Sequence, residues 1–254
     1  MVGEFGAIIS RVYTFAVPYS LSDPMSDSLP DASIESSGIS AAVRELEEDI
    51  VLGSLHPRER LIEDELMRRF ALKRHAAREV LAELARRGLV ERRKNIGCEV
   101  RAFAVQEVVE LYQMRELLEA EAARILPCPL PAEALDRLKA IQREHDQAVA
   151  DEDPRAVFHT NLRFHETLFG FCNNSVLQRA IQEYARQTHA IRFSSLVDAS
   201  YRERARLEHW AMIAALEGGH RDDLIRVCRG HLAPSRDAYL AANRHLTRRE
   251  PGSN

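Results

Sequence analysis

The sequence contains few cysteines and lacks the patterns in which cysteine usually does chemistry. Its 254 residues include Cys98, Cys128, Cys172 and Cys228, and no two of them have the Cys-x-x-Cys spacing of a zinc or redox motif. Four scattered cysteines are too few to form a dense disulfide framework in a chain of this length. We therefore expect free thiols in a reducing compartment.

Long apolar runs are also missing. No stretch approaches the roughly 20 apolar residues that a membrane-spanning helix needs. The N-terminal residues are mildly apolar, but Arg11 interrupts them and no basic leader precedes them, so we expect no signal peptide. These absences predict a cytoplasmic protein without a membrane partner.

The remaining composition is that of an ordinary globular protein, with 45% hydrophobic and 29% charged residues. The length suffices for two domains, each with its own core. Residues 1–39 end in a stretch rich in Ser, Asp and Pro, which predicts a flexible tail. We predict a first domain over residues 40–103, an all-helical second domain over 104–248 and a frayed tail over 249–254.

Residues 60–102 show a helix pair followed by a two-stranded ribbon. The second helix of the pair has one apolar face, made of Ala77, Val80, Leu81 and Leu84. Gly88 ends this helix, and residues 89–93 and 98–102 are predicted strands on either side of a turn at 95–97. This order is the plan of a winged helix-turn-helix, whose second helix enters the major groove of DNA.

Positive charge is concentrated in the same segment. From Lys73 to Lys94 there are eight Lys or Arg and three Glu, a net charge of +5 in a chain whose total is −4. Such a segment predicts a polyanion partner, because bound cations release the counterions condensed on DNA. The alternative is a solvated amphipathic helix. Lys73 and Arg74 stand where a capping Ser or Asp is usual, and a docked phosphate would supply the missing negative charge.

The second half shows only helical periodicity. It predicts six helices, at about 105–126, 131–151, 154–171, 175–198, 201–217 and 221–246. Helices joined by short loops predict an antiparallel bundle. The expected fold class is therefore all-α with a small β-wing.

Polar residues interrupt the apolar stripes of these helices. Asn161 and His165 lie four residues apart in the third helix, His209 lies in the fifth and His231 in the sixth. The last two helices form a hairpin about residues 218–219, and both of their histidines lie roughly 14–18 Å from the turn. The four residues could therefore bind one divalent cation. The alternative is that each histidine is a hydrogen-bonded core residue.

Two further polar residues lie in such stripes. Arg115 lies in the first helix, where an inward guanidinium needs an anion such as Glu119 or the carboxylate of a ligand. His145 lies in the stripe of the second helix, and we assign it no site.

On these residues, from about 40 to 245, the chain resembles the GntR family of bacterial transcription regulators, in the FadR-like branch with an all-helical FCD ligand-binding domain. The resemblance lies in the segments LHPRERLIEDELMRRFALKRHAAREVLAELARRGLVERRKNIGCEV, LYQMRELLEAEAA, NLRFHETLFGFCNNSVL and LEHWAMIAALEGGHRDDLIRVCRGHL. It implies a homodimeric repressor or activator, with repression favoured, that reads a pseudo-palindromic double-stranded DNA operator and responds to a small carboxylate effector.

The resemblance also implies roles for individual residues. The expected DNA contacts are Lys73, Arg74, His75, Arg78, Lys94, Asn95 and Gly97, with the ribbon turn in the minor groove. The expected metal ligands are Asn161, His165, His209 and His231, for zinc first and nickel or manganese as alternatives. Arg115 is expected to hold the effector carboxylate.

Two departures from the family pattern limit what can be transferred. The usual Ser-Arg-Thr-Pro-Val-Arg start of the recognition helix is Lys-Arg-His-Ala-Ala-Arg here, from Lys73 to Arg78, so the operator sequence cannot be carried over. The usual ligand Asp is Asn161, which brings no negative charge, so an effector carboxylate would complete the coordination. The rival functions are a metal-sensing regulator and a metallo-hydrolase.

Overall fold

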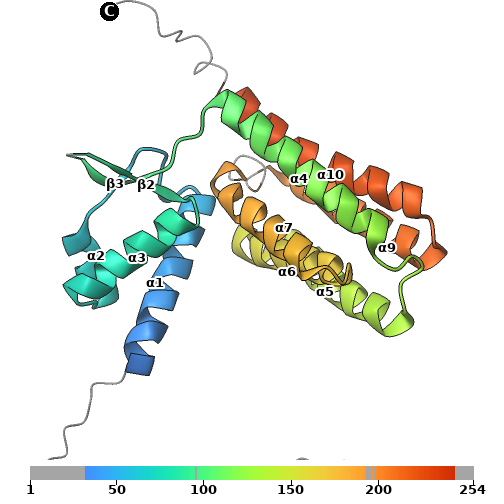
Figure 1. Ribbon diagram of the computed structural model, residues 1–254, viewed down its shortest axis with the longest axis horizontal. Helices are drawn as coiled ribbons and strands as arrows, with labels where there is room; N and C mark the ends of the chain where they lie inside the picture. The colour runs from blue at the N-terminus through green and yellow to red at the C-terminus, as the bar shows by residue number, and fades with distance from the viewer. Residues whose placement is uncertain (1–31, 95, 193–195, 197, 244–254) are drawn as a thin grey trace, which may run out of the picture. The chain divides into compact units, whose positions relative to one another are not determined.

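The computed structural model describes residues 32–94, 96–192, 196 and 198–243 (Figure 1). From Ser33 onward the described residues form a single compact unit. The tails predicted at 1–39 and 249–254 lie mainly outside the described residues. Among those described, no helix is both long and apolar enough to cross a bilayer.

The first part of the described chain is a winged helix-turn-helix. Its elements are α1 (Ala32–Val51), β1 (Arg60–Leu61), α2 (Glu63–Phe70), α3 (Arg74–Arg86), β2 (Val90–Arg93) and β3 (Gly97–Val100). The strands form an antiparallel sheet in the order β1-β3-β2, with Leu61 opposite Cys98 and Val90 opposite Val100. This confirms the predicted helix pair and ribbon.

The apolar face of α3 builds the core of this part, because Val80, Leu81 and Leu84 are buried against Leu46 of α1 and Leu66 of α2. Two details differ from the sequence prediction. Helix α1 begins at Ala32 rather than at residue 40. Strand β1 was not predicted, because two residues are too few to show a strand periodicity.

The second part is helical, as predicted. Its elements are α4 (Val105–Ile125), α5 (Ala132–Ala150), α6 (Pro154–Gly170), α7 (Ser175–Gln187), the 3₁₀ turn η1 (His189–Ile191), α9 (Ala199–Gly218) and α10 (Arg221–Ala242). Helix α10 packs along α4 and α9, and α5 packs along α6 and α9 (Figure 1). The fourth helix ends at Gln187, earlier than the predicted 198, because the chain turns at Thr188 into η1.

The turn between α2 and α3 depends on one residue with a left-handed backbone. Ala71 ends α2 with φ 53° and ψ 36°, and its N–H bonds to the carbonyl of Met67. A left-handed L-residue costs roughly 1–2 kcal/mol. Ala71→Gly should therefore raise the free energy of unfolding of the full chain by about 0.5–1 kcal/mol, measured by urea denaturation.

The matched control for that prediction is Ala82→Gly. Ala82 is also exposed but lies inside α3, where the same change should lower the free energy of unfolding by about 1 kcal/mol. Equal destabilisation by the two substitutions would contradict the left-handed turn.

Candidate functional site

The exposed side of α3 presents the cations predicted to contact DNA. Lys73 precedes α3 without any capping side chain, as the sequence suggested. The guanidiniums of Arg74 and Arg78 are more than half exposed. Arg74 Nη2 donates to Asp64 Oδ1 at 2.8 Å, and Arg78 Nε donates to both Glu63 oxygens at 3.0–3.1 Å. The acidic first turn of α2 thus neutralises both arginines at a surface where phosphates could compete for them.

The remaining predicted DNA-contacting residues lie on the same module. His75 and Lys94 are exposed. Gly97 has φ 98°, which only glycine adopts readily, and lies at the tip of the ribbon. Asn95 lies outside the described residues.

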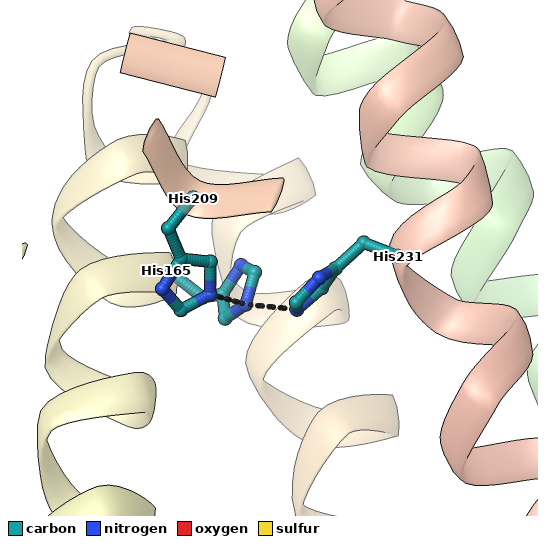
Figure 2. A group of neighbouring side chains, drawn as sticks. All are labelled: His165, His209 and His231. Carbon is teal, nitrogen blue, oxygen red and sulfur yellow. Dashed lines mark hydrogen bonds between the residues drawn. The ribbon is translucent and has the colours of Figure 1, made fainter. Parts of the chain in front are cut away.

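Three of the four predicted metal ligands meet inside the helical part (Figure 2). His165 projects from α6, His209 from α9 and His231 from α10. The Nε2 atoms of His165 and His231 are 3.0 Å apart, and those of His165 and His209 are 3.3 Å apart. The three rings therefore point their Nε2 atoms at one common place, as Figure 2 shows.

The outer nitrogens of two rings are fixed by hydrogen bonds. His209 Nδ1 lies 2.8 Å from Gln142 Oε1, and Gln142 donates its Nε2 to Asp146, which orients the amide. His231 Nδ1 lies 2.8 Å from Glu208 Oε2. Both Nδ1 atoms therefore carry the ring proton, and both Nε2 lone pairs face inward. This is the arrangement by which neighbouring groups orient metal-binding histidines.

The protonation state also suits a metal. Burial, reinforced by His231, holds the pKa of His165 and His209 well below the ordinary histidine value, so both rings are neutral at pH 7. Nitrogen ligands about 2.0–2.1 Å from an ion lie about 2.8–3.4 Å from neighbouring ligands in octahedral or tetrahedral coordination. The two separations from His165 Nε2 fall in that range, and all three ligand atoms lie within 4.8 Å of one another. The three imidazoles are therefore a donor set that suits a divalent cation.

Asn161 and His145 lie beside this cluster. Together with His231 and Glu208 they line a small cavity of about 70 Å³. The His145 ring is 5.0 Å from that of His209, its Nδ1 lies 2.8 Å from Thr160 Oγ1, and burial lowers its pKa to about 4. No site is predicted for His145 from the sequence, and the structure places it against the histidine cluster.

Arg115 lies between this small cavity and a larger one of about 250 Å³ and lines both. Its side chain is 97% buried. It donates Nε and Nη2 to Glu119 Oε1 at 3.0 and 2.8 Å, and Nη1 to Thr188 Oγ1 at 3.0 Å. Glu119 is therefore an anionic partner of this guanidinium, and it is one of the two alternatives predicted from the sequence.

A second, partly buried guanidinium, that of Arg192, lines both cavities as well. Burial and the nearby Arg115 lower the pKa of Arg192 to about 10, so it still carries its charge at pH 7. Two guanidiniums therefore border both cavities, and the carboxylate of Glu119 lies near both of them. The sequence offered no signal for Arg192, because it lies at the end of a short 3₁₀ turn rather than in a helix stripe.

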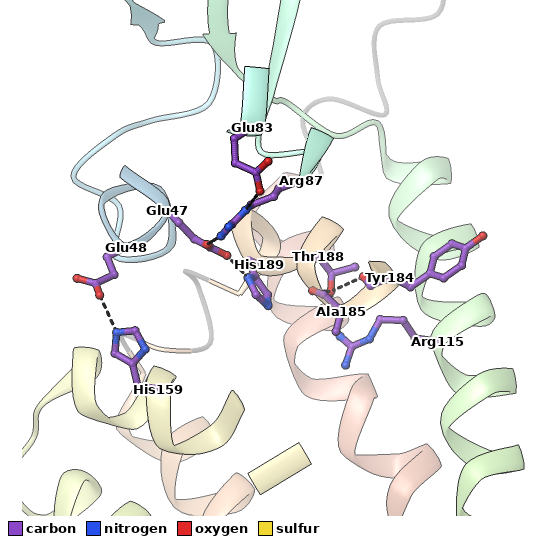
Figure 3. A network of polar contacts seen from close by, with 10 residues as sticks. All are labelled: Glu47, Glu48, Glu83, Arg87, Arg115, His159, Tyr184, Ala185, Thr188 and His189. Atoms are coloured by element: carbon purple, nitrogen blue, oxygen red, sulfur yellow. Dashed lines mark hydrogen bonds and ion pairs between the residues drawn. The ribbon is translucent and has the colours of Figure 1, made fainter. Parts of the chain in front are cut away.

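The larger cavity is also lined by residues of the winged part (Figure 3). Arg87 Nη1 donates to Glu47 Oε2 at 2.8 Å, and His189 Nδ1 lies 2.5 Å from Glu47 Oε1. Burial raises the pKa of Glu47, but the hydrogen bonds from His189 and Arg87 outweigh it, so the pKa lies below its ordinary value. Nearby, His159 Nε2 lies 2.7 Å from Glu48 Oε1. These contacts join α1 to the helical part.

Comparison with known proteins agrees with both halves of the fold. Residues 39–100 match the family described as bacterial regulatory proteins, gntR family, and residues 110–234 match the FCD domain. The HTH-type transcriptional regulator YdhC of Bacillus subtilis (strain 168), which is uncharacterized, is 25% identical over 65% of this chain and 74% of its own length. The Nta operon transcriptional regulator of Aminobacter aminovorans is 23% identical over 72% of this chain and 86% of its own.

Solved structures show the same fold. A protein assigned as a GntR transcriptional regulator from Rhodococcus sp. RHA1 superposes with a TM-score of 0.69 at 20% identity, over 81% of this chain and 99% of its own. McbR/YncC of E. coli superposes with a TM-score of 0.67 at 17% identity, over 83% of this chain and 98% of its own.

The histidine cluster generates a prediction about metal binding. Zinc at about 100 times its dissociation constant should stabilise the full chain by about 2.7 kcal/mol, because it binds only the folded state. His209→Ala should abolish this stabilisation, measured as the zinc-dependent shift of the melting temperature. His159→Ala, which removes a histidine outside the cluster, should keep it. A zinc-dependent shift that survives His209→Ala would refute the site.

Proposed function

Because the chain belongs to the GntR family of bacterial regulatory proteins and carries an FCD domain, we propose that it is a repressor whose operator affinity is set by a small carboxylate bound beside a divalent metal. A transcription regulator of this family is not an enzyme, so the metallo-hydrolase suggested by the histidines is dropped. The observation that carries the proposal is the convergence of three imidazoles beside the guanidiniums of Arg115 and Arg192.

The proposed DNA-binding surface is the exposed face of α3 together with the ribbon between β2 and β3. Helix α3 enters the major groove, with Arg74 and Arg78 exchanging their carboxylate partners for phosphates and base edges. Lys73 and His75 contact the backbone at the start of the helix, and Lys94, Asn95 and Gly97 bring the ribbon to the minor groove. A homodimer places two such surfaces on the half-sites of a pseudo-palindrome in the bacterial cytoplasm.

The proposed sensing site is the histidine cluster with its two cavities. His165, His209 and His231 hold the ion, zinc first and nickel or manganese as alternatives, and the side-chain oxygen of Asn161 is available as a further ligand. The bound ion supplies a positive charge that attracts a carboxylate. Arg115 and Arg192 add two more positive charges at the same place, so the effector's anionic group is stabilised from several sides.

The effect on DNA is a population shift. The effector changes operator affinity only as far as it binds one arrangement of the protein better than another. The contact of His189 with Glu47 links the larger cavity to α1, and Glu47 in turn holds Arg87 at the end of α3. This chain of contacts supports a route from the sensing site to the DNA-binding helix.

Removal of one arginine tests the DNA-binding surface. Arg78→Ala should weaken binding to a fragment selected from random DNA by the original protein about 10- to 100-fold, because a bidentate arginine contact is worth about 1–3 kcal/mol. Fluorescence anisotropy of the labelled fragment measures this. Arg86→Ala removes another exposed arginine, at the far end of α3, and should have little effect. Specific binding that survives Arg78→Ala at full strength would defeat the assignment.

A titration separates the effector-controlled regulator from the metal sensor. At fixed saturating zinc, adding a small dicarboxylate such as succinate should change operator affinity by roughly 5- to 150-fold, the usual range of allosteric coupling. Zinc added to chelated protein without a carboxylate should leave operator affinity nearly unchanged. The opposite pattern, with zinc alone as the signal, would favour the metal-sensing alternative.

A further inference from the structure

Two histidines on the wall of the larger cavity each have one nitrogen without a hydrogen-bond partner. They are His165, from the metal-binding cluster, and His189, from the 3₁₀ turn that contacts the winged part. The unpartnered atoms are His165 Nδ1 and His189 Nε2, and both are shielded from bulk solvent. A buried polar nitrogen without a partner is costly, so each of them points to a ligand group or an ordered water.

The required partner of His189 follows from its contact with Glu47. The His189 side chain is 97% buried, and its Nδ1 lies 2.5 Å from a carboxylate oxygen. A carboxylate only accepts hydrogen bonds, so Nδ1 carries the ring proton. Burial lowers the pKa of His189 to about 4, which keeps the ring neutral at pH 7. Nε2 is therefore an acceptor, and its partner must be a donor.

The required partner of His165 has the opposite polarity. Its Nε2 faces the Nε2 atoms of His231 and His209 at 3.0 and 3.3 Å. When an ion occupies that place, Nε2 is a ligand and the ring proton lies on Nδ1. The Nδ1 proton then needs an acceptor in the cavity, and a carboxylate oxygen is the strongest one available.

The charges on the cavity wall indicate whether the donor is a charged ammonium group or an uncharged group. Four guanidiniums and three carboxylates line the cavity: Arg87, Arg115, Arg186, Arg192, Glu47, Glu119 and Glu166. The net positive charge favours an anion and disfavours a ligand that also carries an ammonium group. The donor facing His189 is then uncharged, and a hydroxyl is the simplest uncharged donor on a small carboxylate.

We propose that the larger cavity binds a hydroxycarboxylate, whose carboxylate accepts a proton from His165 Nδ1 and whose hydroxyl donates to His189 Nε2. The inference rests on the proposed metal-assisted carboxylate effector and names its chemical class. A cavity of about 250 Å³ suits a molecule of this size. His189 is the specificity-determining residue, and through Glu47 it carries the signal of a bound hydroxyl to α1.

The experiment compares matched acids that differ by one hydroxyl. Succinate is paired with malate, glutarate with 2-hydroxyglutarate, and butyrate with 3-hydroxybutyrate, in calorimetric titrations of the zinc-loaded full chain. In at least one pair the hydroxylated acid should bind about tenfold tighter or more, because its absence leaves His189 Nε2 unpaired. Binding without any preference across all pairs would mean that only water serves His189, and would overturn the inference while leaving the carboxylate effector intact.

Variants of His189 test whether it reads the hydroxyl. His189→Phe removes the hydrogen-bond acceptor. In the pair whose hydroxylated acid binds more tightly, it should bring the ratio of the two affinities close to one, with little change in affinity for the acid that lacks the hydroxyl. His189→Gln keeps a donor for Glu47 and an acceptor for the ligand, and should restore most of the preference. A ratio that stays unchanged in His189→Phe would refute the role of this residue.

His159→Phe is the matched control. His159 also bonds to a glutamate of α1, Glu48, but it does not line the larger cavity. Its replacement should leave the affinity ratio unchanged, which separates recognition of the hydroxyl from a general loosening of α1. If no acid of any pair binds to the original protein, the proposed carboxylate effector fails, and this inference fails with it.

Discussion

Three imidazole lone pairs directed at one point impose the strongest constraint in the helical part. His209 and His231 have their outer nitrogens committed to Gln142 and Glu208, so their inner nitrogens cannot donate to each other. A single proton on His165 Nε2 would have to be shared between the Nε2 atoms of His231 and His209. A divalent ion could accept the lone pairs of all three rings. The packing of α6, α9 and α10 therefore brings three histidines together in an arrangement that could hold a cation.

Buried positive charge is the second constraint, and it sets the chemistry of the adjoining cavities. Removing a guanidinium from water is expensive unless a bonded anion compensates it. Glu119 and Thr188 satisfy the donors of Arg115. Arg192 lies close enough for Arg115 to lower its pKa, and Glu119 acts on it in the opposite direction. Both guanidiniums line the two cavities beside the histidine cluster.

The two halves of the chain are joined by polar contacts as well as by an apolar cluster, in which Val51 of α1 packs with Val157 and Phe158 of α6. Glu47 lies at their centre, because it accepts from Arg87 of α3 on one side and from His189 on the other (Figure 3). Hydrogen bonds between charged groups can exchange partners at lower cost than packed apolar side chains can rearrange. The polar part of this joint can therefore rearrange more readily than the apolar part.

The fold class and the candidate ligands could be predicted from the sequence, because both depend on periodicity within single elements. The apolar spacing of Val80, Leu81 and Leu84 marked the helix that packs on the winged core, and the places of His209 and His231 on either side of a glycine turn indicated that they could meet. Only the folded chain shows the partner of His189 and the positions of Arg192 and His145. Glu47 and His189 are 142 residues apart and lie in elements whose contact no local pattern encodes. Which buried nitrogen lacks a partner is a property of packing, so only the folded chain could reveal it.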